Sequence, residues 1–218
     1  MRLLSGDTRA APSVPGPGHA APLGWQRTDT VGTELVLWPD TRRAAAEGTS
    51  VIVGRPAYTV HWHTEAGADL TVRALTVACR GAGWSRTLRL SRLSRLNGPN
   101  RGPAWACRTD ETGELPAPLP GIDDPARLDP DAVVRLVDSP IFVSWAVRRL
   151  RLTPQPGAVR VPTVRVLTPS LVVLPAMSTY HLVGPGRLRI GGDEPASVYD
   201  LDGDCLVTYQ SGRCRLVR

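Results

Sequence analysis

The chain has 218 residues, of which 42% are hydrophobic. Its formal net charge is +6, and all 26 basic residues are arginine. This size and hydrophobic content predict one folded domain and exclude a chain that is disordered throughout. No apolar run approaches the ~20 residues of a membrane span. We attribute the excess of arginine to a GC-rich genome; the alternative is a basic surface that binds nucleic acid or anionic lipid.

Residues 1–22 consist mostly of Ala, Pro, Gly and Ser. Such a segment buries too little apolar surface to offset its ordering entropy, so we expect a disordered tail before a single domain at 23–218. The segment also lacks the apolar stretch of a signal peptide, which predicts a cytoplasmic protein with reduced cysteines. In an oxidising compartment, Cys205 and Cys214 would be the expected disulfide because they flank a short turn.

The first half of the domain shows the alternation of half-buried strands. Short strands are expected at Leu35–Trp38 and Ser50–Val53. From Tyr58 to His63, alternate residues are apolar, and the same alternation returns from Leu70 to Cys79. Because a glycine-containing turn separates these two runs, they predict a hairpin.

The pattern between Trp84 and residue 127 is less regular. A strand is expected from Trp84 to Leu90, and three arginines between residues 89 and 95 recur at every third position. They indicate either a ladder for phosphates or a solvated strand edge, and we favour the edge because no aromatic residues interleave them. A strand through Trp105 precedes a long surface connection at 110–127.

The stretch at 128–150 contains the only phenylalanine. It has breaks at Asp129-Pro130-Asp131 and Asp138-Ser139-Pro140, and then alternating apolar residues lead to Arg148 and Arg149. We interpret its last part as a strand, which would point the two arginines to opposite faces. The inward one would need a carboxylate partner, Asp129, Asp131 or Asp138, because an unpaired buried charge is costly. The alternative is that this arginine binds an anionic headgroup through its planar fork.

The last third contains many short apolar segments. Strands are expected at Val159–Leu167, Ser170–Leu174, Ser178–Val183, Arg187–Ile190, Val198–Leu201, Cys205–Tyr209 and Arg213–Val217. Asp202-Gly203-Asp204 is typical of a hairpin turn. Short strands at regular spacing, separated by turn residues, predict an all-β barrel, roll or sandwich.

The order of these features resembles a bacterial family called Putative glycolipid-binding, a domain of unknown function. The similar segments are Trp25, Gly32-Thr33-Glu34, Gly48–Gly54, Tyr58-Thr59-Val60, Trp105, Leu128–Asp131, Ser139–Leu150 and Tyr199–Tyr209. The resemblance covers about residues 25–218 and implies a spiral β-roll, which is a single, strongly curved antiparallel sheet or open barrel. It also implies a lipid or glycolipid ligand, although that label rests on fold analogy. Ser144, Ala146 and Ser178 stand where the family has Asn, Pro and Gln, so some of its polar groups are replaced here.

Other chemistries have weaker support in the sequence. His61 and His63 share one strand face and could hold a metal together with His181, but we expect a solvated face, no metal and no cofactor. No Gly-x-Ser-x-Gly motif is present, and the paired carboxylates fall in turns where Asp is common. We therefore expect that the protein is not an enzyme.

The sequence leads us to expect a non-enzymatic, cytoplasmic binding protein for an amphipathic small molecule or lipid, with its site on the open side of a curved sheet. The alternatives are a basic surface for nucleic acid, which we do not favour, and a hydrolase of unknown type. The residues expected to contact the ligand are Trp62, Trp105, Trp145, Tyr180, Arg148 and Arg149, with Trp84 as a further apolar wall. The sequence predicts no oligomeric state.

Overall fold

The computed structural model describes residues 22–67, 69–93, 104–153, 157–192 and 195–217. Apart from Pro22, the expected tail at 1–22 lies outside the described residues, as does Arg95, the last of the three regularly spaced arginines. The strands are β1 (Leu23–Arg27), β2 (Val31–Leu37), β3 (Glu47–Val53), β4 (Tyr58–Ala66), β5 (Val72–Gly81), β6 (Trp84–Arg92), β7 (Trp105–Gly113), β8 (Val133–Leu136), β9 (Val159–Val166), β10 (Val173–Gly184), β11 (Arg187–Gly192), β12 (Ser197–Leu201), β13 (Val207–Gln210) and β14 (Cys214–Val217). A 3-10 helix, η1 (Pro125–Arg127), lies between β7 and β8, and an α-helix, α1 (Ile141–Leu150), lies between β8 and β9.

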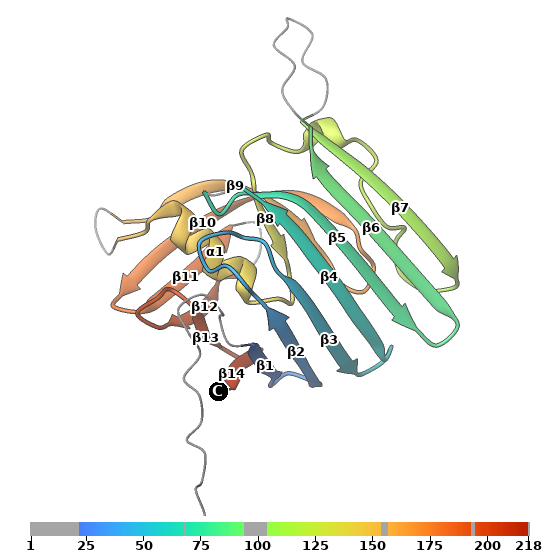
Figure 1. Cartoon of the computed structure of the whole chain (residues 1–218), viewed down its shortest axis with the longest axis horizontal. Helices are drawn as coiled ribbons and strands as arrows, with labels where there is room; N and C mark the ends of the chain where they lie inside the picture. The colour runs from blue at the N-terminus through green and yellow to red at the C-terminus, as the bar shows by residue number, and fades with distance from the viewer. Residues whose placement is uncertain (1–21, 68, 94–103, 154–156, 193–194, 218) are drawn as a thin grey trace, which may run out of the picture.

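All fourteen strands belong to one open sheet that curves around α1 (Figure 1). Strands β1 to β7 form one antiparallel meander and β9 to β14 a second. The two meanders are joined where β1 pairs with β14, from Gly24 opposite Val217 to Arg27 opposite Cys214. This arrangement confirms the expected all-β class and the curved, unclosed sheet. The sheet is mixed, however, because β8 runs parallel to β9.

Several strands are longer than the sequence pattern predicts. Strand β7 extends to Gly113, into the segment that we expected to be a surface connection. Strand β10 is one strand of 12 residues where two were expected, and its pairing with β9 continues through Pro175. Pairing with β11 begins only at Ser178, so Pro175 has a neighbouring strand on one side alone. A strand tolerates the missing N–H of proline in such a position.

The prediction of a strand at 141–150 is wrong, because this segment is the helix α1. Its apolar residues alternate, as in a strand, but they also recur at the three- and four-residue spacing of a helix face. Ile141, Phe142 and Trp145 pack into one core cluster, while Val143 and Val147 pack into a second cluster. Because α1 lies between the two clusters, it is apolar on both sides, and the sequence pattern alone does not distinguish it from a buried strand.

Aromatic side chains fill the space between the sheet and α1. The Trp62 ring on β4 makes edge contacts with Phe142 and Trp145 of α1, and Trp38 contacts Trp145. Gly48, which is opposite Trp62 on β3, lies directly against the indole, so that even a β-carbon there would collide with the ring. We call the side of the sheet that faces α1 the inner face, and the opposite side the outer face.

The segment between β7 and β8 crosses the inner face and is held by two side-chain donors, the buried Trp105 and the half-buried Arg92. Trp105 donates its indole N–H to the Asp129 carbonyl (2.9 Å), and Arg92 donates to the carbonyls of Pro130 and Ala132. This segment and α1 therefore occupy the open side of the sheet, where we expected the ligand. No helix in the described part of the chain has the length and apolarity of a membrane span.

Candidate functional site

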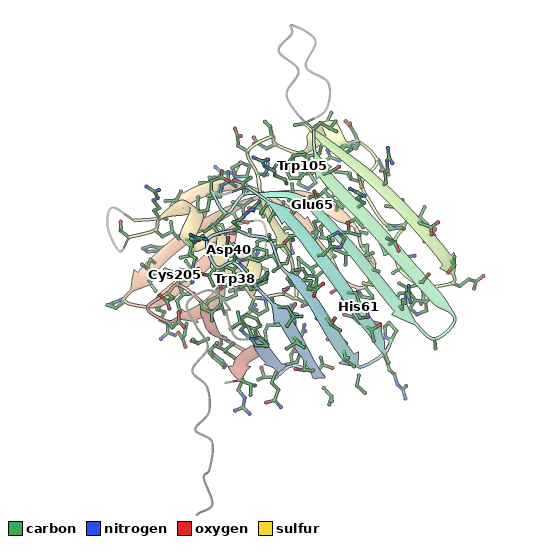
Figure 2. All side chains as sticks on the ribbon, in the orientation of Figure 1. Trp38, Asp40, His61, Glu65, Trp105 and Cys205 are labelled. Carbon is green, nitrogen blue, oxygen red and sulfur yellow. The ribbon has the colours of Figure 1, made fainter. Side chains whose placement is uncertain are left out.

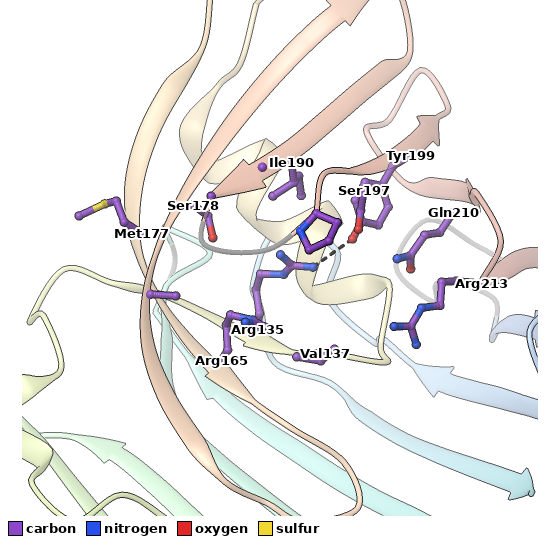
Figure 3. A pocket seen from close by; sticks show the side chains of 14 residues that line it. Arg135, Val137, Arg165, Met177, Ser178, Ile190, Ser197, Tyr199, Gln210 and Arg213 are labelled. Carbon is purple, nitrogen blue, oxygen red and sulfur yellow. Dashed lines mark hydrogen bonds between the residues drawn. The ribbon is translucent and has the colours of Figure 1, made fainter.

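A polar cavity of about 70 Å³ lies between β8 and the strands of the second meander (Figure 3). Three arginines line it: Arg135 on β8, Arg165 on β9, and Arg213 just before β14. Tyr199 and Gln210 complete the polar wall. None of the described residues that line this cavity is acidic. We call it the arginine cavity.

Parallel pairing brings two of these arginines together, because Arg135 is the register partner of Arg165. Arg135 Nη2 donates a hydrogen bond of 3.0 Å to the Tyr199 hydroxyl (Figure 3). The Tyr180 hydroxyl is fully buried nearby and has no hydrogen-bond partner within the described ranges. Burial raises the pKa of Tyr180, and the positive charge of Arg135 opposes that rise.

A second, much smaller cavity of about 10 Å³ surrounds Glu34 on β2. Glu34 is only 3% exposed, and its Oε1 accepts a hydrogen bond of 3.0 Å from the Trp62 indole. Its Oε2 and the Ser139 hydroxyl have no partner of good geometry among the described residues. Burial raises the pKa of Glu34 to about 7, although Ser139 and Trp62 oppose the rise. This cavity is close to the ~10–15 Å³ that a single water molecule needs, so it is too small for a ligand.

An ion-pair network links the two cavities. Asp138, which lines the smaller one, pairs with Arg27 (3.0 Å) and with Arg213 of the arginine cavity (3.2 Å). Asp29 pairs with both arginines at 2.7 and 3.4 Å. Burial tends to raise the pKa of Asp29, but hydrogen bonding and the charge of Arg27 hold it below its usual range. The network therefore keeps Arg213 in a fixed position at the edge of the arginine cavity.

The third candidate is a shallow groove on the outer face. It consists of two depressions of about 270 and 480 Å³ that share Leu37, Glu47 and His63. Leu35 and Leu37 are 49% and 42% exposed there. The surface of this outer groove is therefore mostly apolar, and Glu47 and His63, which line both depressions, add a carboxylate and an imidazole.

The structure places Arg148 and Arg149 on the last turn of α1. Arg148 donates to the carbonyls of Asp204 (2.7 Å) and Thr41 (3.1 Å), and its guanidinium lies 4.8 Å from the centre of the Trp38 ring. Arg149 donates to the Asp131 carbonyl (3.4 Å) and lines a separate surface depression. Asp138, one of the expected carboxylate partners, pairs with Arg27 and Arg213.

The aromatic residues that we expected to contact a ligand are buried. Trp105, Trp145 and Tyr180 are at most 2% exposed, and Trp84 is also buried. The ring of Trp62 packs against α1 on the inner face, and the residue is also one of those that border the outer groove. The ligand-binding role of these residues, and of Arg148 and Arg149, stays a prediction. Figure 2 shows Trp38 beside α1 and Trp105 near one end of the sheet.

The structure describes three of the four histidines and all four cysteines. His61 and His63 lie exposed on the outer face, and His61 Nδ1 is 3.1 Å from the Thr49 hydroxyl. Within the described ranges, no three His, Cys, Asp or Glu side chains form a group that could hold a metal ion. All four cysteines are free thiols, and burial raises the pKa of Cys79 and Cys214 to about 12. Thiols of such high pKa are poor nucleophiles.

Of the residues that line the two cavities, we expected Asp138 as a carboxylate partner, but we did not expect Glu34 or the three arginines as site residues. The sequence contained a signal for Glu34. It lies two residues before the buried Val36 on the same strand, so the two side chains point to the same face of the sheet. A carboxylate on the buried face of a strand indicates a special site. By contrast, Arg135 and Arg165 come together only through the parallel pairing of β8 with β9, which the sequence did not predict.

Comparison with a solved structure supports the fold. A crystal structure of a DUF1089 family protein from Pseudomonas aeruginosa matches 94% of this chain and 97% of its own, with a TM-score of 0.55 and 17% sequence identity. At this identity the likeness shows the fold alone. No curated protein matches the chain.

The sequence also matches a model of one protein family. That match covers residues 22–215, which include every strand from β1 to β13 and the residues of both cavities and the outer groove. It confirms the resemblance that the sequence motifs indicated. The chain therefore belongs to the family described as "Putative glycolipid-binding".

Proposed function

We propose that the protein is a non-enzymatic binding protein for an amphipathic, lipid-like or glycolipid-like ligand, and that the outer groove receives the apolar part of this ligand. The description of its family supports this class of ligand. The observation that carries the proposal is the pair of half-exposed leucines, Leu35 and Leu37, in an apolar groove.

The dimensions of the groove suit such a ligand. Sites for small molecules commonly measure about 300–1,000 Å³, are mostly apolar, and have a few polar groups that set orientation. The two depressions of the outer groove, at about 270 and 480 Å³, are comparable. His63 and Glu47, which line both, provide a donor or acceptor and a carboxylate for a polar headgroup.

We further propose that the protein works in a bacterial cytoplasm. The four free thiols, of which Cys107 and Cys205 are half-buried, support a reducing compartment, because disulfides are rare there. The arginine-rich composition is consistent with a GC-rich bacterial genome.

Native mass spectrometry of the purified protein tests the proposal. The protein is incubated with a total bacterial lipid extract, and we expect a bound species with the mass of an amphipathic lipid. The double substitution Leu35→Ser and Leu37→Ser should abolish this species. The matched control Val31→Ser changes a residue of the same strand that is 70% exposed but does not line the groove, so it should leave loading intact.

Salt dependence separates this function from the nucleic-acid alternative. Burial of an apolar chain is little affected by salt, whereas binding to a polyanion weakens steeply as salt increases. Lipid loading that persists from low to high salt would support the proposal. A protein that binds no lipid, or that loads equally well with both leucines replaced, would overturn it.

A further inference from the structure

We propose that the edge strand β7 is an interaction surface, and that its partner is β7 of a second copy of this chain. The two strands would pair antiparallel about a two-fold axis at Thr109, so that the two sheets become continuous. Strand β7 shares no residue with the outer groove, so this proposal stands independently of the function proposed above.

The two ends of the sheet differ in how open they are to a partner. Strand β8 ends the sheet on one side, but it has only four residues, and three of them are buried. Strand β7 ends it on the other side, where it has nine residues, of which the last six are exposed (Figure 1). It pairs with β6 in regular register from Trp105 to Gly113, without a bulge. A long, regular edge of this kind presents unpaired N–H and C=O groups to a strand of another molecule.

The segment that follows β7 covers its inner face and not its edge. Arg86 of β6, which is only 4% exposed, donates to the Pro118 carbonyl, and a β-carbon on Gly121 would meet the side chain of Thr109. Arg86 lies two residues before the buried Leu88, and Thr109 lies opposite Leu88, so both side chains point to the inner face. The contacts therefore place this segment beneath β6 and β7.

Two charged side chains on the outer face of β7 are left unpaired within the molecule. Among the described residues, Arg108 and Asp110 form neither an ion pair nor a side-chain hydrogen bond. Arg108 lies opposite Arg89 of β6, and like charges directly opposite one another are unfavourable. By contrast, Glu111 on the inner face pairs with Arg86 at 3.2 Å. The exposed edge thus carries one positive and one negative charge, two residues apart on the same face.

The spacing of these two charges selects one register. Opposite residues of an antiparallel pair lie on the same face, so the outer face of one copy would continue into the outer face of the other. With Thr109 on the axis, Arg108 of each copy is opposite Asp110 of the second copy, which gives two ion pairs. The neighbouring registers that keep the same face instead place Arg108 opposite Arg108, or Asp110 opposite Asp110. Charges on an edge strand commonly prevent pairing, but these charges favour one self-complementary arrangement.

The size of this interface predicts a reversible dimer. Stable interfaces have about 20–30 residues on each side, and smaller ones are typical of transient contacts. A pairing of nine residues from each copy is below that range. We therefore expect monomer and dimer to exchange, with the dimer fraction rising with protein concentration.

Analytical ultracentrifugation of the full chain over a series of concentrations tests the proposal through charge reversal. Arg108→Asp and Asp110→Arg should each weaken dimerisation by about tenfold or more, because each places like charges opposite one another. The double substitution Arg108→Asp with Asp110→Arg should restore it. An equimolar mixture of the two single variants should also dimerise, because one is negative at both positions and the other is positive at both.

Arg80→Asp is the matched control, because it makes the same change of charge at an exposed residue of β5, two strands away from the edge. It should leave the dimerisation constant unchanged within about twofold. Hydrogen exchange provides a measurement that needs no variant. The backbone amides of β7 should exchange more slowly at high than at low protein concentration, whereas those of β12, in the second meander, should not change.

A protein that stays monomeric at every concentration would overturn the proposal and would show that the charges of β7 keep this edge unpaired. A dimer that Arg108→Asp and Asp110→Arg weaken no more than Arg80→Asp does would also overturn it, because the copies would then associate through another surface. The same holds if the mixture of the two single variants dimerises no better than each variant alone.

Discussion

At the scale of single residues, the buried charged side chains differ in how completely they are paired. Arg27, whose side chain is 10% exposed, pairs with Asp29 and Asp138, and Arg86 pairs with Glu111 and donates to three backbone carbonyls. These contacts satisfy the requirement that a buried arginine be paired and hydrogen-bonded. Glu34 differs, because one of its oxygens has no partner of good geometry among the described residues.

Glu34 predicts a pH dependence of stability. Its pKa is about 7 in the folded protein, against 4.5 as the ordinary value. Between these two pKa values, the Glu34 carboxyl group keeps its proton in the folded state and loses it in the unfolded state. The free energy of unfolding therefore falls as pH rises, and the stabilising contribution of Glu34 is lost above about pH 7. We expect urea unfolding at pH 5 and at pH 8 to show this loss in the unmodified protein but not in Glu34→Gln. Between the two pH values, the free energy of unfolding of Glu34→Gln should rise by about 2–3 kcal/mol relative to that of the unmodified protein.

The control for this measurement is Glu47→Gln, which changes an exposed carboxylate on the adjacent strand β3. It should follow the unmodified protein at both pH values within ~0.5 kcal/mol. If the difference between Glu34→Gln and the unmodified protein does not change with pH, then Glu34 is ionised in the folded state and the assignment of its pKa is wrong.

At the scale of secondary-structure elements, α1 is the centre of the molecule. Besides its two apolar faces, it makes a specific polar contact with the sheet. The Ser144 hydroxyl accepts a hydrogen bond of 2.9 Å from the buried Val207 N–H and donates to the Pro140 carbonyl (3.4 Å). The Val207 carbonyl in turn accepts from the Trp25 indole at 2.9 Å. Strand β13 is thus held to both α1 and β1 through one residue.

Replacing Ser144 with alanine tests this link. The Val207 N–H would be left buried without its acceptor, which should lower the free energy of unfolding by about 1–3 kcal/mol. Hydrogen exchange at the Val207 amide should accelerate by more than the global loss of stability explains. Ser85→Ala removes an exposed hydroxyl that contacts Thr112, and it should cost less than ~0.5 kcal/mol. Equal effects of the two substitutions would show that Ser144 does not hold β13.

At the scale of the whole molecule, the pairing of the short strands β1 and β14 makes the sheet continuous. Strand β14 has four residues and lies between β1 and β13, so it connects the two meanders. Its Cys214 is buried, and Leu216 packs against the larger core cluster. Loss of this strand would expose two sheet edges with unpaired backbone groups.

Deletion of residues 213–218 should therefore destabilise the protein strongly. We expect a melting temperature lower by more than about 10 °C, or aggregation on gel filtration. Deletion of residues 2–21 is the control, because β1 begins at Leu23 and every strand contact described here is retained. It should leave the melting temperature within a few degrees of that of the full chain. A stable, monomeric protein without β14 would show that each meander folds without the other.

The sequence by itself determined the class of this fold and two of its hairpins, β4 with β5 and β12 with β13. Alternation in β4 and β5 and the Asp-Gly turn before β13 are local signals, since strand periodicity and turn chemistry depend on neighbouring residues. The resemblance to the family added the prediction that the sheet curves into a roll. Only the tertiary structure decided the conformation of 141–150, because its apolar pattern fits a helix and a strand equally and burial between two core clusters selected the helix. Tertiary structure also decided the sites, because long-range pairing brings together Arg135, Arg165 and Arg213, and Glu34 and Ser139, which lie far apart along the chain.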